Sequence, residues 1–423
     1  MSAQKLRKWM MSKISQINGD DGNALVSASI DLGQRIEFAN KLRGIAAVSV
    51  VFYHYAMFWY YPWASRLWGN LPDVVPVKSS WLPFLYQFPV QRPPAYLPTI
   101  DWGAFGVALF FLLSGFVIAN SARSYSAKDF LLNRVLRIYP TYAVGFVFVL
   151  AAHAVAGWNY GRGLPYSGAR MVAHSFPGIR QFVDALFVDA SYIDPIIWTL
   201  EVEIKFYLVV FVLILMRQSG VNLRATSVGT GIGVLTVLLC LLVPVTAVSM
   251  WQLLSDAQFV CFILIGTVFF QHWNADISRF ELMKNAGVLF FLFALAWAIS
   301  DQRGMSGQFI GRIWSYLAAI AVFVTAMRFS SLFVRPRGIV NFYSEISYPL
   351  YVVHLGTGYL VMSLIKDYLG LPLAVNIALA FGASTLTAWV LHMAVELPTM
   401  RMARIYRARH RLNPLNQSNS QAR

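Results

Sequence analysis

Long apolar runs constrain this chain more than any other feature of its sequence. A helix needs roughly 20 predominantly apolar residues to cross the hydrocarbon core of a bilayer. Ten stretches qualify or nearly qualify, and they lie at about 44–61, 103–121, 140–157, 199–216, 228–247, 255–271, 286–300, 311–327, 344–365 and 372–394. The sequence therefore predicts an all-α, polytopic membrane protein with about ten transmembrane helices.

The composition of the 423 residues agrees with this class. Apolar residues make up 57% of the chain and charged residues 13%, against about 25% charged residues in a typical soluble domain. Two cysteines, Cys240 and Cys261, are too few for a disulfide framework or for a metal site of their own. Disordered, coiled-coil, collagen-like and disulfide-stapled secreted proteins are excluded, and no metal ion is expected.

The distribution of Lys and Arg predicts the orientation in the membrane. The chain has 34 Lys and Arg against 19 Asp and Glu, a formal net charge of +15. The termini and alternate connections place 24 of the basic residues on one face and nine on the other, and Lys205 lies inside the fourth stretch. Because cytoplasmic segments are enriched in Lys and Arg, both termini are expected in the cytoplasm. The excess charge then needs no nucleic-acid partner.

The apolar stretches define one predicted membrane domain, residues 35–400. Residues 1–34 are basic and lack the apolar core of a secretory signal, so we expect a cytosolic N-terminal extension. Residues 401–423 predict a basic cytosolic tail that suits anionic lipid headgroups. Two long connections on the opposite face, about 62–102 and 158–198, are rich in Trp, Tyr, Pro and Gly and are long enough to have a function.

Ionisable residues inside apolar stretches mark candidate sites. Arg43 begins the first stretch, and His54 follows eleven residues later, on nearly the same helix face and about 16 Å deeper. A guanidinium at the inner surface suits a phosphate-bearing ligand, and a neutral imidazole suits proton abstraction from a hydroxyl. The alternative is structural: Arg43 sets the topology, and His54 bonds a neighbouring helix.

A small pair and a basic segment follow the second stretch. Ser114 and Gly115 favour close helix packing, and a serine nucleophile is the weaker interpretation because no glycine-flanked elbow surrounds Ser114. Arg134 and Arg137 are three residues apart, hence on one helical face, and precede Tyr142. Two interpretations of these arginines stay open: a clamp for a diphosphate, or ordinary charges on the cytoplasmic side.

Two acidic residues open the fourth stretch, which follows Trp198. Glu201 and Lys205 are four residues apart, so we expect them to pair. Glu203 has no such partner and points to a different face. It is therefore the better candidate for a catalytic or substrate-orienting carboxylate, with Tyr207 one turn further on.

The late stretches contain further ionisable residues. His354 in the ninth stretch lies about as deep as His54, and a site shared with His54 and a purely structural histidine are both open interpretations. Glu396 closes the tenth stretch and is interpreted as structural, with an arginine at the inner surface as its partner. His392, Asp301 and Asp256 receive no assignment.

Six segments together resemble one known family, acyltransferase family 3. Arg43 to His54 resembles its R-x10-H signature. The other segments that resemble its motifs, in family order, are Phe110–Phe116, Arg134–Tyr142, Trp198–Tyr207, Ser347–His354 and Glu396–Arg401. Asn40-Lys41 stands where the family commonly has Asp-Gly, so no carboxylate role is transferred to that position. We expect no esterase-like domain of the kind fused to some members.

The resemblance implies a multi-pass protein of the inner membrane that transfers an acyl group. The expected co-substrate is an acyl-coenzyme A, acetyl-CoA being favoured, with no bound cofactor. The expected acceptor is a hydroxyl of a cell-surface polysaccharide, exopolysaccharide or glycolipid precursor, chosen by the two long outer connections. Membrane lipid and glycan-assembly proteins are expected partners.

The resemblance, read with the residues themselves, also suggests roles for ten side chains. The expected catalytic residues are His54, Arg43 and Glu203. The expected donor-binding residues are Arg134, Arg137 and Tyr142, and the expected acceptor-binding or orienting residues are Trp198, Tyr207, His354 and Ser114. A multi-pass transporter or flippase for a glycan-related substrate, with a histidine and carboxylate proton relay, is the alternative function. A non-catalytic scaffold is the third.

Overall fold

The computed structural model describes residues 20–60, 77, 79, 81–88, 99–159, 196–305, 308–333 and 338–406. Its long helices are α2 (Asp20–Tyr60), α5 (Trp102–Ser124), α6 (Ala127–Asn159), α9 (Ile197–Gln218), α10 (Ala225–Leu242), α11 (Val248–Trp273), α12 (Arg279–Gln302), α13 (Phe309–Arg328), α15 (Ser347–Leu369) and α16 (Leu373–Leu391). The short elements are α4 (Leu82–Tyr86), η1 (Ser330–Phe333), α14 (Ile339–Glu345) and the π-helical turn η2 (His392–Glu396). Two two-residue strands, β1 (Gln87–Phe88) and β2 (Ile100–Asp101), pair antiparallel.

The prediction of an all-α, polytopic membrane protein is confirmed. Among the described residues, seven helices are long and apolar enough to cross a membrane, namely α5, α10, α11, α12, α13, α15 and α16 with its continuation to Tyr406. Arg43 and His54 lower the mean hydropathy of α2, and three charged residues near the start of α9 lower that of α9. Ten crossings and cytoplasmic termini remain predictions.

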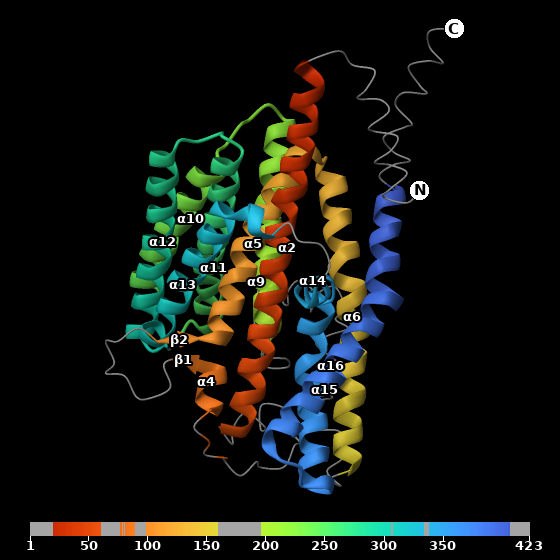
Figure 1. Ribbon diagram of the computed structural model, residues 1–423. Helices are drawn as coiled ribbons and strands as arrows, with labels where there is room; N and C mark the ends of the chain where they lie inside the picture. Colours follow the sequence, from red (N-terminus) through yellow and green to blue (C-terminus); the bar gives the residue numbers. More distant parts are fainter. Residues whose placement is uncertain are drawn as a thin grey trace.

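The long helices form two groups on either side of a central layer (Figure 1). Helices α10 to α13 lie on one side and α6, α15 and α16 on the other, with α2, α5 and α9 between them. Helix α5 packs against α2, α11 and α13, and α2 packs against α14 and α15 as well. The central helices therefore contact both groups.

Helix α2 contributes to two hydrophobic cores. Its residues in the core with α5, α9, α11 and α13 are Phe38, Ala39, Leu42, Ala46 and Val50. Its residues in the core with α15 and α16 are Ala47, Val51, Tyr55, Ala56, Phe58 and Trp59. At about 100° per residue, Arg43 and His54 fall between these two apolar stripes. The helical period thus places both polar side chains on the seam between the two halves of the bundle.

Two glycines allow α5 and α11 to approach closely. A Cβ atom at Gly115 would lie 1.9 Å from the carbonyl oxygen of Ile263, and one at Gly266 would lie 2.1 Å from that of Leu112. The packing role favoured for the Ser114-Gly115 pair is therefore correct for Gly115. Ser114 itself lines a cavity.

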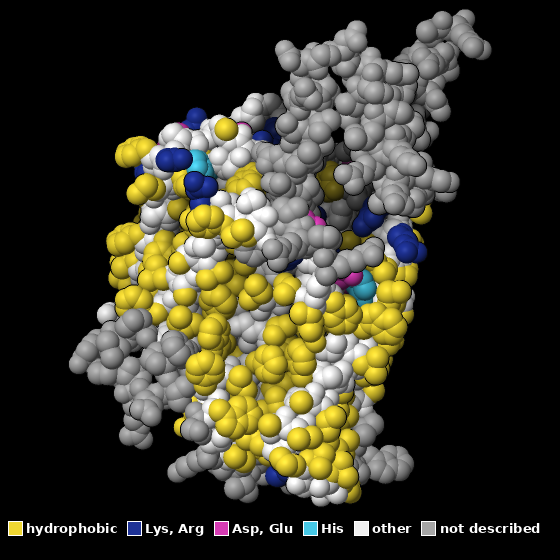
Figure 2. Space-filling view, in the orientation of Figure 1, with side chains coloured by type: hydrophobic (Ala, Val, Ile, Leu, Met, Phe, Trp, Pro, Cys, Tyr) yellow, Lys and Arg dark blue, Asp and Glu magenta, His cyan; other side chains and the backbone are white. Residues whose placement is uncertain are grey.

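The two ends of the bundle differ in charge. Among the described residues, the connections and helix ends near the junction of α5 with α6 carry Arg123, Lys128, Arg217, Arg224, Arg279, Lys284, Arg328, Arg401 and Arg404, whereas the opposite end carries Arg303, Arg312 and Lys366. Figure 2 shows most of the visible Lys and Arg side chains at one end and a broad apolar surface below them. We call these the basic end and the opposite end.

Three helices extend beyond the apolar stretches that predicted them, and the domain boundaries themselves stay predictions. Helix α2 runs without a break from Asp20, through the boundary expected at residue 34, and the last helix continues to Tyr406. Helix α6 begins at Ala127 rather than near 140, so Arg134 and Arg137 belong to the helix itself. Residues 1–19 and 407–423 and most of the outer connections 62–102 and 158–198 lie outside the described residues.

Candidate active site

Two cavities lie back to back in the central layer. One encloses about 870 Å³ of empty volume and is lined by Arg43; the other encloses about 950 Å³ and is lined by His54. Three side chains line both cavities, so the cavities adjoin there, and we call these three residues the partition: Val107, Ile196 and Tyr351. The sequence predicts Arg43 and His54 on one helix stripe, which the structure bears out in α2, but it places them in adjoining chambers rather than in one.

The Arg43 cavity collects six of the ten residues that the sequence predicts for a site. They are Arg43, Ser114, Arg137, Tyr142, Glu203 and Tyr207, and they come from α2, α5, α6 and α9. Ser347 and Tyr348 at the start of α15 complete its polar wall. Two guanidinium groups therefore face a chamber that also contains a carboxylate.

Glu203 is the centre of the hydrogen bonds in this cavity. Its Oε1 atom accepts from the hydroxyl of Ser114 at 2.6 Å and from the hydroxyl of Tyr207, one helical turn along α9, at 2.5 Å. Its negative charge also acts on the guanidinium of Arg43. Glu203 thus holds two hydroxyls in place and offsets one of the two arginine charges.

Arg134 lies behind the cavity rather than in its wall. Its side chain is buried, and its guanidinium carbon lies 5.6 Å from the centre of the Phe130 ring and 5.5 Å from that of the Tyr207 ring. Nη2 donates to the hydroxyl of Ser121 at 3.5 Å. Arg134 therefore supports Tyr207, whereas Arg137, one turn further along the same helix, reaches the chamber.

The His54 cavity is lined by aromatic side chains. Its wall contains Tyr53, Trp198, Phe259, Trp297, Tyr316, Tyr351 and Tyr359. Trp198, which the sequence predicts for acceptor binding, stands at the start of α9, and its ring packs 5.2 Å from that of Phe259. Trp198 and Tyr207 were predicted to share a role, but they face different chambers.

His54 and His354 are in direct contact, which answers the question of whether they share a site. Nε2 of His354 lies 3.0 Å from Nδ1 of His54. His354 is fully buried behind His54 and does not line the cavity, whereas His54 is partly exposed to it. The two histidines therefore form a pair of which one member faces the chamber.

The hydrogen bonds of His354 fix the proton positions of this pair. Nδ1 of His354 lies 2.8 Å from the carbonyl oxygen of Tyr351 and 3.2 Å from that of Leu350. Carbonyl oxygens only accept, so this nitrogen carries a proton and Nε2 of the neutral ring is an acceptor. Nδ1 of His54 must then donate to it, and the His54 ring also bonds the Val50 carbonyl. By this network, Nε2 of His54 carries the free lone pair.

Close approach of α2 and α15 makes the histidine contact possible. A Cβ atom at Gly358 would lie 2.2 Å from the hydroxyl oxygen of Tyr55. That hydroxyl donates to the carbonyl of His354 at 2.9 Å, and Tyr359 donates to the carbonyl of His54 at 3.2 Å. Each helix thus bonds the backbone of the histidine on the other.

Lys205 pairs with Asp256, a residue of another helix that received no assignment from the sequence. Its ammonium forms a buried ion pair with Asp256 of α11, and both side chains are almost completely excluded from solvent. The sequence predicted Glu201 as the partner of Lys205 because four residues separate them. The structure assigns this role to Asp256, which faces Lys205 across the interface of α9 with α11.

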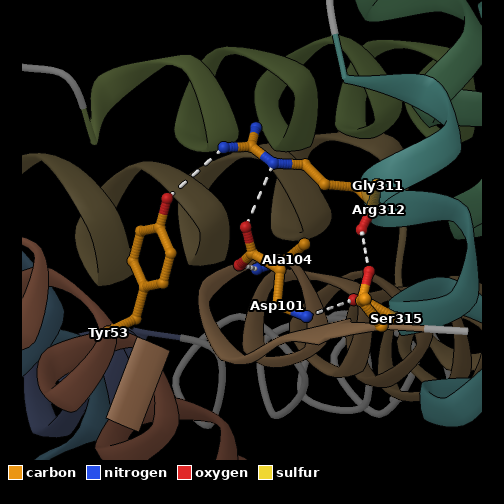
Figure 3. Close-up of polar contacts among 7 residues, drawn as sticks. Tyr53, Asp101, Ala104, Gly311, Arg312 and Ser315 are labelled. Atoms are coloured by element: carbon orange, nitrogen blue, oxygen red, sulfur yellow. Dashed lines mark hydrogen bonds and ion pairs between the residues drawn. The ribbon is translucent and has the colours of Figure 1, made fainter. Parts of the chain in front are cut away.

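A polar cluster in the His54 cavity was missed by the sequence analysis. Nε of Arg312 donates to Oδ2 of Asp101 at 3.2 Å, and Nη2 donates to the hydroxyl of Tyr53 at 3.3 Å (Figure 3). Asp101 precedes α5, outside its membrane span, and caps it by accepting from the amide of Ala104 at 2.8 Å. Burial raises the pKa of the Asp101 carboxyl, and the Arg312 guanidinium acts against this rise. The available signal was an aspartate just before an apolar run.

His392, a histidine without an assignment from the sequence, pairs with Glu396. Nδ1 of His392 lies 2.6 Å from Oε2 of Glu396 across the π-helical turn η2. The negative charge of Glu396 also acts on Arg43. The printed contact of the Glu396 carboxylate is thus with His392, and its pairing with an arginine of the inner surface stays a prediction.

Comparison with known proteins adds two matches. A family model described as an acyltransferase domain matches residues 36–393. Nodulation protein 10 of Rhizobium leguminosarum bv. viciae is 32% identical over 188 residues, which cover 42% of this chain and 43% of the relative. The chain therefore matches less than half the length of this relative. No solved structure matches it.

Proposed function

Because the chain belongs to acyltransferase family 3, we propose that it transfers an acyl group, acetyl being favoured, from acyl-coenzyme A to a hydroxyl of a glycan or glycolipid. The observation that carries this proposal is the histidine pair beside the partition between two chambers. One chamber offers arginines for an anionic donor, and the other offers a base for a hydroxyl. We propose that the basic end faces the cytoplasm of an inner membrane, as the positive-inside rule indicates.

The donor belongs in the Arg43 cavity. Coenzyme A carries several phosphates, and guanidinium groups bind phosphate by charge-assisted hydrogen bonds. Arg43 and Arg137 supply two such groups in this chamber, with Tyr142 beside them. In this position the acyl thioester points toward the partition, where the hydroxyl of the acceptor meets it.

The reaction at His54 is a direct transfer. Nε2 of His54 takes the proton of the acceptor hydroxyl while its oxygen attacks the thioester carbon. The carbon–sulfur bond then breaks, and the imidazolium returns the proton to the coenzyme A thiolate. His354 keeps the proton of His54 on Nδ1, so that Nε2 is available as the base. A positioned general base contributes a factor of about 10² to 10⁴.

The test is a comparison of His54→Ala with wild type in lipid nanodiscs. Release of free thiol from acetyl-CoA, and alkali-labile label on the acceptor from radiolabelled acetyl-CoA, report the transfer. The variant is expected to lose a factor of about 10² to 10⁴ in rate. His272→Ala, whose ring bonds the Ile277 carbonyl near the basic end, is the matched control. Equal rates for wild type and His54→Ala would refute the proposal, and a transporter would release no thiol.

A further inference from the structure

The ion pair of Arg312 with Asp101 stands in the chamber that contains the proposed base. Both residues line the His54 cavity. Arg312 belongs to the first turn of α13 and Asp101 to β2, so the contact joins segments 211 residues apart in sequence. Figure 3 shows the guanidinium between Tyr53 and Asp101.

The guanidinium of Arg312 is held in one place by its neighbours. The carboxylate of Asp101 accepts a hydrogen bond from Nε, and the hydroxyl of Tyr53 accepts one from Nη2. Asp101 is itself held, because its backbone amide donates to the hydroxyl of Ser315 at 2.9 Å. The ring of Tyr53 packs against Gly103, where a Cβ atom would lie 2.6 Å from it. Arginine side chains have large rotamer entropy, so a guanidinium fixed in advance loses less on binding a ligand.

Arg312 retains hydrogen-bond donors that nothing in the described part of the chain uses. A guanidinium has five N–H groups. One on Nε and one on Nη2 have partners, whereas Nη1 has none among the described residues. The side chain of Arg312 is 34% exposed, and that of Asp101 is 14% exposed. The unused N–H donors therefore belong to Arg312, which is the more exposed member of the ion pair.

The charges in this chamber balance each other. Among its lining residues, Arg312 and Asp101 are the two with formal charges, and they oppose each other at hydrogen-bond distance. An acidic ligand would bring a second carboxylate close to Asp101 without a second cation to offset its desolvation. A neutral ring with hydroxyl groups accepts hydrogen bonds from Nη1 and packs its apolar face on the surrounding aromatic side chains.

We propose that Arg312 is an acceptor-binding residue, held in position by Asp101 and Tyr53, and that this pair selects an uncharged, hydroxyl-bearing ring over an acidic one. The inference rests on the proposed function, since it places the acceptor in the His54 cavity. It adds an acceptor contact more than 250 residues from His54 in sequence and a basis for discriminating charge.

The experiment measures thiol release from acetyl-CoA by the full chain in nanodiscs. The acceptors are methyl glucoside, galactoside and mannoside, each paired with the methyl glycoside of its uronic acid. Wild type is expected to favour the neutral member of a pair by roughly tenfold or more in kcat/KM. A lost hydrogen bond to a charged group corresponds to roughly a tenfold or larger rise in KM, so Arg312→Gln and Arg312→Lys should show such a rise for the neutral acceptor.

Asp101 is tested by its effect on specificity. Asp101→Asn and Asp101→Ser remove the negative charge, and both residues still cap a helix well. The unbalanced Arg312 should then attract the uronic acid and reduce the preference for the neutral glycoside roughly tenfold. A residue needed only for folding would lower both rates together. Arg303→Gln, at the same end of the bundle, removes an arginine that bonds the carbonyls of Cys240 and Leu241 and should leave both rates unchanged.

Several outcomes would overturn this inference. The first is a KM for the neutral acceptor that equals that of wild type in both Arg312 variants. The second is a preference for the neutral glycoside over the uronic acid that stays unchanged in both Asp101 variants. The third is a preference of the wild-type protein for the uronic acids. Thiol release by wild type that no neutral glycoside stimulates would also refute the ligand class while leaving the proposed function standing. If wild type releases no thiol under any condition, the proposed function itself fails, and the acceptor site with it.

Discussion

His354 Nε2 lies 3.0 Å from His54 Nδ1, although 300 residues separate the two histidines. The buried ring accepts the proton of the ring that faces the cavity. His354 does not line the cavity, so in the proposed reaction it acts through His54, by deciding which nitrogen of that ring carries the lone pair. The contact links the first and the ninth predicted membrane stretches.

The first prediction concerns this proton arrangement. His354→Ala removes the acceptor for Nδ1 of His54, so the other tautomer becomes accessible and kcat should fall by about 10 to 10²-fold, as for the loss of an outer partner that orients a histidine. The KM for acetyl-CoA should stay the same. His354→Gln, whose side-chain oxygen accepts a hydrogen bond, should recover part of the rate. Steady-state thiol release measures both constants, and equal losses in both variants would contradict the positioning role.

The second prediction concerns the partition. Val107→Phe adds a ring at the boundary that both cavities share and should reduce acyl transfer at least about tenfold, because misplacement of about 1 Å between reacting groups costs about 10²-fold. Coenzyme A affinity, measured by titration calorimetry, should remain that of wild type. Val107→Ile, a smaller change, serves as the control. Loss of coenzyme A binding in Val107→Phe would show that this side chain belongs to the donor site alone.

The third prediction separates direct transfer from an acyl-enzyme. Ser114 bonds Glu203 in the Arg43 cavity and does not line the His54 cavity. Ser114→Ala should therefore retain turnover, reduced by at most about 10- to 150-fold, since Tyr207 still bonds Glu203 and one hydrogen bond to a charged group contributes about 1.5–3 kcal/mol. Intact-protein mass spectrometry after mixing with acetyl-CoA should show no added acetyl group. A stable 42-Da adduct (about the mass of one added acetyl group) that disappears in Ser114→Ala would establish a relay.

The fourth prediction concerns stability. Removing one partner of a buried ion pair leaves an uncompensated charge and costs about 3–5 kcal/mol. Asp256→Asn should thus lower the unfolding temperature in detergent markedly, because Lys205 loses its buried partner. The double variant Lys205→Met with Asp256→Leu should recover most of the loss. Cys240 and Cys261 are both buried, so a thermal scan that detects exposure of their thiols measures the unfolding temperature. An unfolding temperature of Asp256→Asn equal to that of wild type would show that the pair does not stabilise the bundle.

The sequence predicts those features of this fold that are local. Apolar runs and the helical period place Arg43 and His54 on one stripe of α2, and the lack of a nearby base identifies Glu203 as different from Glu201. These inferences need only the spacing along one helix. The same is true for Gly115, whose small size indicates close packing in any membrane bundle.

Contacts between distant helices were beyond that reasoning. Glu201 lies four residues before Lys205 and was the predicted partner, yet the ion pair of Lys205 forms with Asp256, because the interface of α9 with α11 brings that carboxylate close. Arg312 received no assignment from the sequence, and only the position of β2 beside α13 brings it to Asp101 in the His54 cavity. The depth of Arg43 and His54 along α2 likewise does not reveal that they line different cavities, which adjoin at Val107, Ile196 and Tyr351.

The partition of Val107, Ile196 and Tyr351 bears on how the membrane stays sealed. A catalyst that joins reactants from two compartments risks becoming a leak for protons and ions. Here the two hollows adjoin at the same few hydrophobic and aromatic groups, and in the proposed reaction the hydrogen removed from an alcohol goes to the departing sulfur. In the proposed reaction the acyl fragment and that hydrogen therefore change places between the two hollows, so no net charge crosses the bilayer with them.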